Sequence, residues 1–250
     1  MSRISNIFFW VPNAITSLNL ICGSLAVFFA INAQLGWAAV FIFAAAIFDF
    51  LDGFSARLLK AYSTIGKELD SLADLISFGL APAAMVFTMI QLALFGKINQ
   101  IQYINANPSQ WILLFSSLII TVSGAFRLAK FNTDDRQSEG FLGMPIPANA
   151  IFFASLGLII EIGEKQEIAS FILNKYTLLI SIFACSFLMV SELPMFNLKF
   201  KNLKLRENAL RYLFLGVTIL MLIFLQIYAL PLIIIWYIFL SVISQMAIAK

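Results

Sequence analysis

Four aspartates lie close together in an otherwise strongly apolar part of this chain. The pattern is Asp49-x2-Asp52-Gly53-x2-Ala56-Arg57-x8-Gly66-x3-Asp70-x3-Asp74. An ionised carboxylate inside hydrocarbon costs about 3 kcal/mol even on lenient insertion scales. Four of them near one another therefore require bound cations or a polar cavity. We predict that these residues form the functional centre.

The spacing of the four aspartates indicates a shared metal site. On helices, Asp49 and Asp52 are three residues apart and Asp70 and Asp74 four apart, so each pair lies on one helix face. The chain has no histidine, and carboxylate oxygens alone suit Mg²⁺ or Mn²⁺. One or two such ions could support a displacement at phosphorus. The alternative from the residues alone is that Asp70 and Asp74 serve ion transport or proton relay.

The composition identifies the elements that must carry these carboxylates. Of the 250 residues, 61% are hydrophobic and 12% are charged, against roughly 25% charged in a soluble domain. We predict an all-α integral membrane protein, with residues 1–250 forming a single membrane domain and no cleavable signal peptide. About eight transmembrane helices are expected, near 13–33, 36–59, 70–95, 111–131, 145–163, 176–193, 210–228 and 230–249.

The basic residues predict the orientation of these spans. Of the 16 Lys and Arg residues, Lys97, Lys165 and Lys175 fall on one side of the eight-span arrangement, and the other 13 fall opposite. By the positive-inside rule, both termini and the aspartate site face the cytoplasm from a multi-pass inner-membrane protein. The net charge of +3 then reflects topology and membrane lipids, and no nucleic-acid partner is expected.

Three further sequence features have plain interpretations. Cys22 and Cys185 both lie in predicted spans, where a small apolar core residue is expected rather than a disulfide. Residues Met1–Trp10 could lie in the headgroup plane, because apolar side chains gather there beside a basic one. Residues Met195–Arg206 could do the same or form an ordinary loop.

The aspartate pattern resembles the signature of the CDP-alcohol phosphotransferase family at every fixed position. The resemblance implies a six-helix catalytic core within residues 10–206 and a homodimer, and it does not cover the two additional C-terminal spans predicted in 207–250. It also implies transfer of a phosphatidyl-type group from a CDP-linked lipid to an alcohol, with release of CMP. Asp49, Asp52, Asp70 and Asp74 would bind the metal, and Asp74 would also be the catalytic base.

The same resemblance implies a set of residues that contact the CDP-lipid. They are Pro12, Asn13, Thr16, Asn19, Gly53, Ala56, Arg57, Ser63 and Gly66. From the residues alone, Arg57 could instead be a topology charge at the end of a span. Ser63 could simply cap a helix, and Pro12, Asn13 and Thr16 could be ordinary residues at the start of a span.

Other segments bear on the acceptor alcohol. Residues 127–132, 141–148 and 193–196 resemble the phosphatidylserine synthase branch of the family, with Lys130 and Met144 as departures. We therefore expect CDP-diacylglycerol and L-serine as substrates. Arg127, Lys130 and Asn132 are the predicted acceptor-binding residues, since a zwitterion needs oppositely charged or polar partners.

Two alternatives stay open at this stage. A glycerol-3-phosphate or inositol phosphate acceptor would keep the family but require a denser basic cluster. A cation transporter would also use membrane carboxylates, but near the bilayer midplane on discontinuous helices. The helical rise places these aspartates in the cytoplasmic third of their spans, which argues against a transporter.

Overall fold

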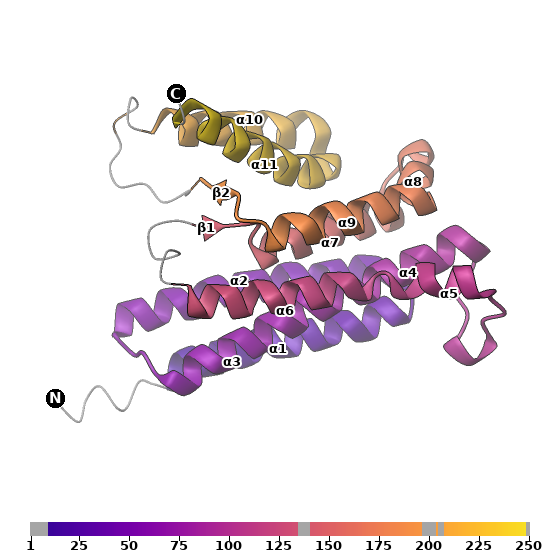
Figure 1. Cartoon of the computed structure of the whole chain (residues 1–250), viewed down its shortest axis with the longest axis horizontal. Coiled ribbons are helices and arrows are strands. Elements are labelled where there is room, and N and C mark those ends of the chain that lie inside the picture. Colours follow the sequence, from indigo (N-terminus) through magenta and orange to yellow (C-terminus); the bar gives the residue numbers. More distant parts are fainter. Residues whose placement is uncertain (1–9, 135–140, 197–203, 205–207, 249–250) are drawn as a thin grey trace.

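The protein is a bundle of long, roughly aligned helices, as a computed structural model shows (Figure 1). The structure describes residues 10–134, 141–196, 204 and 208–248. The first half contains α1 (Trp10–Ile31), α2 (Leu35–Leu59), α3 (Thr64–Asp74), the π-helical segment η1 (Leu75–Leu80), α4 (Ala81–Phe95), the 3-10 turn η2 (Ile101–Tyr103), α5 (Pro108–Phe115) and α6 (Leu118–Thr133). The second half contains β1 (Phe141–Leu142), α7 (Ile146–Ile162), α8 (Gln166–Ile172), α9 (Lys175–Val190), β2 (Pro194–Met195), α10 (Ala209–Leu225), the 3-10 turn η5 (Gln226–Tyr228) and α11 (Ala229–Ile248). The segments predicted to lie in the headgroup plane fall mostly outside the described residues.

Several helices are long and apolar enough to cross a bilayer, so this is a multi-pass membrane protein. Five helical segments of the described chain meet this condition, or six if α8 and α9, bent by 60° at their junction, form one span. Helix α7 is shorter, at 17 residues, because it begins only at the proline-rich entry and ends before Gly163. The segment Ala209–Ser244 contains the predicted span 210–228 and most of the predicted span 230–249, and Figure 1 shows α10 and α11 side by side. The structure thus supports five to six spans, while the count of eight stays a prediction.

Small side chains let the first two helices approach closely. Ala26 and Ala30 on α1 and Ala38, Ala39 and Ala45 on α2 are all fully buried. Interfaces between membrane helices favour such residues, because the backbones gain van der Waals contact when they come close. The close packing of α1 against α2 therefore supports the residues at the end of this hairpin opposite the link between the two helices.

The links between helices separate into two ends of the bundle (Figure 1). The α2–α3 link, the C-terminal end of α6, both strands and the start of α10 lie at one end. The α4–α5 and α7–α8 links lie at the other. The described helix ends that carry Arg57, Lys60, Lys67, Arg127, Lys130 and Arg211 thus share one end.

The described residues also contain a short β-ladder, which the all-α prediction did not include. Strands β1 and β2 pair antiparallel, with Phe141 opposite Met195 and Leu142 opposite Pro194. Two-residue strands leave no sequence periodicity to detect, so the ladder could not be predicted from alternation. It joins the segment before α7 to the segment after α9.

Candidate active site

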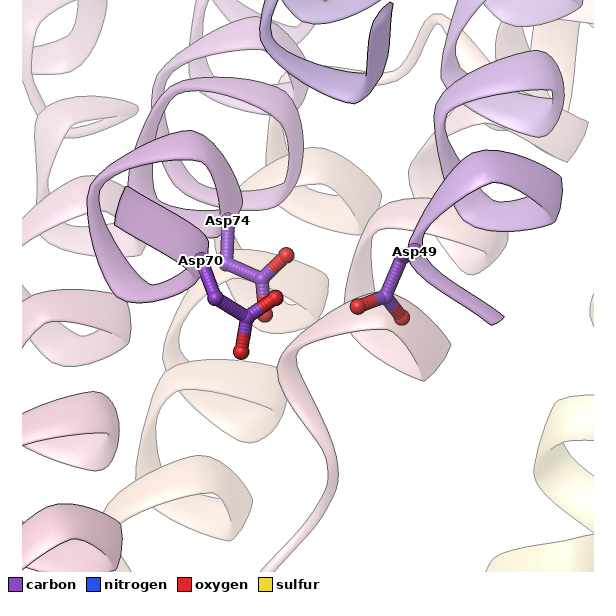
Figure 2. Close-up of side chains that lie close together, drawn as sticks. All are labelled: Asp49, Asp70 and Asp74. Atoms are coloured by element: carbon purple, nitrogen blue, oxygen red, sulfur yellow. The ribbon is translucent and has the colours of Figure 1, made fainter. Parts of the chain in front are cut away.

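Three of the four aspartates converge between two helices. Asp49 comes from α2, and Asp70 and Asp74 come from successive turns of α3, facing it (Figure 2). Each contributes a carboxylate oxygen to a group in which all three atoms lie within 4.8 Å of one another. Asp74 is buried, and Asp49 and Asp70 are half-buried. The helix faces predicted from the spacing do meet across one gap.

The fourth aspartate is held apart from this group. Asp52 is buried, and its Oδ2 accepts a hydrogen bond of 2.7 Å from the Thr16 hydroxyl of α1. Three residues along a helix correspond to about 60° of rotation, so Asp49 and Asp52 share a face but point in different directions. The structure thus places Asp52 against α1, and its predicted role as a metal ligand stays a prediction.

Helix α1 also holds the carboxylate of Asp74. The fully buried Asn19 donates a hydrogen bond of 3.1 Å from its Nδ2 to Asp74 Oδ1. The Ser77 hydroxyl donates to the backbone oxygen of Asn19 at 3.0 Å, and a side chain at Gly23 would collide with Ser77. Gly23 therefore lets α1 lie directly against η1, which brings the amide of Asn19 to Asp74.

A π-helical segment follows the last of these aspartates. It spans Leu75–Leu80, immediately after Asp74, and continues into α4. Such segments interrupt α-helical register and occur frequently at functional sites. Here the π-helical segment follows Asp74, whose carboxylate points toward Asp49 of α2. Within the segment, the Ser77 hydroxyl donates to the backbone of α1.

The carboxylate group fits a divalent cation. Among the described residues, no Lys or Arg forms a salt bridge with Asp49, Asp70 or Asp74, whereas Lys130 pairs with Glu192. Buried charges otherwise need a partner, because desolvation costs several kcal/mol per ion. Three oxygen donors within 4.8 Å, with no nitrogen or sulfur ligand, match the preference of hard cations.

A pocket of about 200 Å³ opens beside the carboxylates. Its wall includes Asp52 and Asp70, together with seven of the nine residues predicted to contact a CDP-lipid. These seven are Pro12, Asn13, Thr16, Gly53, Ala56, Ser63 and Gly66. The pocket and the carboxylate group thus share Asp70.

The two glycines of this pocket have different roles. A side chain at Gly66 would lie 2.8 Å from Ser63 Oγ and from Asn13 Oδ1, so only glycine keeps these groups in place. The backbone N–H of Gly66 donates to Ser63 Oγ at 2.9 Å, which caps the N-terminus of α3. A side chain at Gly53 would meet no atom within 4 Å, so this glycine leaves space beside the pocket.

Two predicted contact residues lie elsewhere, and three pocket residues were not predicted. Asn19 lies against Asp74, and the exposed Arg57 is not among the residues that line the pocket. Ala61, Tyr62 and Lys67 line it in addition. They lie in or next to the unspecified x8 stretch of the signature. The chain turns after α2 at Lys60, which has a φ of 51°. Ala61 and Tyr62, which follow this turn, therefore line the pocket.

The predicted acceptor residues divide between two places. Arg127 and Lys130 line a small second pocket with Asp134 and Glu192, at the end of α6. Asn132 instead donates a hydrogen bond of 2.8 Å to the Ser71 hydroxyl of α3. At 100° per residue, Asn132 lies about 140° around α6 from Arg127, so one ligand cannot easily contact both from one side.

Arg127 has the surroundings of a binding residue. It is only 4% exposed, its guanidinium lies 5.2 Å from the ring centre of Phe131, and its Nε has no hydrogen-bond partner within the described residues. A buried guanidinium with an unused donor is costly unless another group pairs with it. The adjacent pocket, at about 10 Å³, holds roughly one water-sized probe in this arrangement.

The Gly-Met-Pro-Ile-Pro segment, residues 143–147, directly follows Leu142, which lines this second pocket. Gly143 has a φ of 75°, and a side chain there would lie 2.7 Å from the carbonyl oxygens of Met189 and Ser191. Its N–H donates to Leu193 O at 2.8 Å, and the next N–H, of Met144, donates to Leu188 O at 2.9 Å. The segment therefore satisfies carbonyls around the C-terminal end of α9, which explains its glycine.

Comparison with known proteins agrees with the sequence signature. The sequence model described as CDP-alcohol phosphatidyltransferase matches residues 9–191. The CDP-diacylglycerol–serine O-phosphatidyltransferase of Bacillus subtilis (strain 168) is 34% identical over 184 residues, which are 74% of this chain and 88% of that protein.

Other organisms have similar proteins of the same name. That of Mycobacterium tuberculosis (strain ATCC 25618 / H37Rv) is 33% identical over 193 residues, covering 74% of this chain and 60% of the relative. That of Methanocaldococcus jannaschii is 32% identical over 164 residues, covering 66% and 64%. The matched region therefore extends over most of the Bacillus protein and less than two thirds of these two.

Proposed function

Because the chain belongs to the CDP-alcohol phosphatidyltransferase family, we propose that it transfers the phosphatidyl group of CDP-diacylglycerol to L-serine and releases CMP. One observation carries this proposal. Asp70 belongs both to the carboxylate group and to the wall of the larger pocket. A CDP group in that pocket therefore has its phosphates beside the carboxylates, where charge must be neutralised during transfer.

The chemistry requires one bond exchange and one proton transfer. The serine hydroxyl oxygen bonds to the lipid-linked phosphorus, and the bond from that phosphorus to the oxygen that leaves with CMP breaks. Asp74 is the proposed base for the hydroxyl proton. Its Oδ1 accepts from Asn19, which orients the carboxylate and leaves Oδ2 for the proton.

The proposed cofactor is Mg²⁺ or Mn²⁺, as one or two ions. Asp49, Asp70 and Asp74 would hold it, with Asp52 as the fourth predicted ligand. When bound, it would supply positive charge to the pyrophosphate and to the leaving CMP. The residues of this chain position the lipid: Ser63 and Gly66 shape the pocket at the start of α3.

The charges of the second pocket favour a zwitterionic acceptor. Arg127 and Lys130 line it together with Asp134 and Glu192, and Lys130 Nζ lies 3.9 Å from Glu192 Oε1. A phosphorylated acceptor would call for an excess of positive charge, whereas serine presents one group of each sign. We therefore propose that this region recognises serine through Arg127, with the walls of the pocket moving apart to admit it.

We also propose an orientation and an assembly. The end of the bundle with both pockets faces the cytoplasm, because the described helix ends there carry most of the described basic residues, namely Arg57, Lys60, Lys67, Arg127, Lys130 and Arg211. This orientation supplies serine and the soluble part of the CDP-lipid from the same side. The homodimer implied by the family resemblance belongs to the same proposal.

The test is CMP release by the purified full-length protein in detergent. CDP-diacylglycerol and Mg²⁺ or Mn²⁺ are supplied with serine, glycerol-3-phosphate, inositol phosphate or no acceptor. We expect release with serine only, and its loss when the metal is chelated. Release only with a phosphorylated alcohol would replace serine as the acceptor. Folded protein that releases no CMP with any acceptor would contradict the proposed reaction.

A further inference from the structure

The last two helices lie beyond the region that matches the family, yet they contact a segment next to the second pocket. The match ends at residue 191, whereas α10 and α11 span Ala209–Leu225 and Ala229–Ile248. Much of their apolar surface is exposed, as expected for helices that face lipid. Their buried polar side chains therefore need a separate explanation.

Helix α11 binds both backbone polar groups of one residue after β2. The Tyr237 hydroxyl donates to Phe196 O at 3.2 Å, and Phe196 N–H donates to the Ser241 hydroxyl at 3.4 Å. Ser241 is fully buried and Tyr237 is 6% exposed. Since Phe196 lies directly after β2, α11 supplies the partners that a longer ladder would otherwise provide.

Aromatic packing strengthens this contact. The ring of Phe196 lies 5.1 Å from that of Tyr237 and 5.8 Å from that of Phe214 on α10, measured between ring centres. Phe214 and Tyr237 also contact each other, at 6.1 Å. Three rings at these distances hold Phe196, the residue after β2, against α10 and α11.

The contact continues to the wall of the second pocket. Strand β2 pairs with β1, and Leu142 of β1 lines the pocket beside Arg127. Helix α11 therefore reaches the wall of the pocket through Phe196 and the ladder.

We propose that α11 is a positioning element for the acceptor site, with Tyr237 and Ser241 holding the β1–β2 ladder against the pocket that contains Arg127. This inference rests on the proposed function and assigns a role to helices outside the matched region. The two residues act through Phe196 and the ladder and do not contact the reacting atoms. Loosening them should weaken acceptor binding while leaving the CDP-lipid pocket, which is built by α1, α2 and α3, unchanged.

The test compares Tyr237→Phe and Ser241→Ala with Ser244→Ala. The Ser244 hydroxyl is also buried on α11, but it donates only to the backbone oxygen of Ser241, so this variant controls for loss of a buried hydroxyl. Each protein is checked for folding by gel filtration and thermal melting in detergent. The KM values for serine and for CDP-diacylglycerol are then measured from CMP release.

We expect Tyr237→Phe and Ser241→Ala to raise the serine KM by about three- to tenfold, as loss of one net hydrogen bond predicts. The KM for CDP-diacylglycerol should stay within about twofold, and Ser244→Ala should match the wild type. Equal changes in both KM values, or an effect of Ser244→Ala as large as that of Ser241→Ala, would overturn the positioning role. If the wild type used a phosphorylated alcohol instead of serine, the proposed function would fail, while the same comparison with that alcohol would still decide the role of α11.

Discussion

Replacement of Asn19 by alanine tests how the proposed base is held. Asn19 is fully buried, and its Nδ2 donates to Asp74 Oδ1 at 3.1 Å. A hydrogen bond to a charged group contributes about 1.5–3 kcal/mol. If this bond orients Asp74 during proton transfer, its loss lowers kcat by about 10- to 150-fold, at 1.36 kcal/mol per tenfold.

The control is Ser77→Ala, at the same junction of α1 and η1. This change removes the hydrogen bond from the Ser77 hydroxyl to the backbone oxygen of Asn19 but leaves the amide contact with Asp74. We expect its kcat to stay within about threefold of the wild-type value, because a neutral hydrogen bond contributes only about 0.5–1.5 kcal/mol and this one does not touch the carboxylate.

The assay is CMP release at saturating serine and CDP-diacylglycerol, with binding of the CDP-lipid measured separately. Asn19→Ala should keep its affinity for CDP-diacylglycerol within about threefold, since Asn19 does not line the pocket. A kcat close to that of the wild type would refute the argument that Asn19 orients the base. An equal loss in Ser77→Ala would refute it as well, because the cause would then be general packing of α1 against η1.

Three further changes test other parts of the site. Asp74→Asn should abolish turnover and leave CDP-lipid binding largely intact, because it removes the proton acceptor but keeps the shape; robust CMP release would exclude Asp74 as the base. Arg127→Ala should raise the serine KM more than the KM for CDP-diacylglycerol, and similar increases in both would argue against a serine site at Arg127. Gly143→Ala should lower the melting temperature, because Gly143 has a φ of 75° and an added side chain would lie 2.7 Å from two carbonyl oxygens. An unchanged melting temperature would show that the β1 segment can shift to make room.

The spacing of residues within single helices was enough to predict much of the site. Asp70 and Asp74 lie on one face of α3 because residues four apart always do, and apolar surroundings required that their charge be compensated. The family resemblance, rather than helix spacing, selected Thr16, Gly53 and Gly66, which the structure brings to one pocket. The signature did not specify Tyr62 or Lys67, which reach the pocket through the turn after α2.

The rotation and register of one helix against another were decided only by tertiary packing. Gly23 allows α1 to lie against Ser77, and this contact brings Asn19 to Asp74 and away from the pocket lining. In the same way, Asp52 accepts a hydrogen bond from Thr16 of α1 and lies outside the group formed by the other three carboxylates.

The sequence by itself thus determined that this is a membrane protein with a carboxylate centre and a CDP-alcohol transferase signature, because hydropathy, charge and helical periodicity are local properties. Only the tertiary structure decided which carboxylates meet, that Arg127 and Asn132 face different neighbours, and that Tyr237 on α11 reaches the β1–β2 ladder. The physical reason is that these contacts join residues far apart in the chain. Their geometry depends on how side chains of several helices fill the space between them.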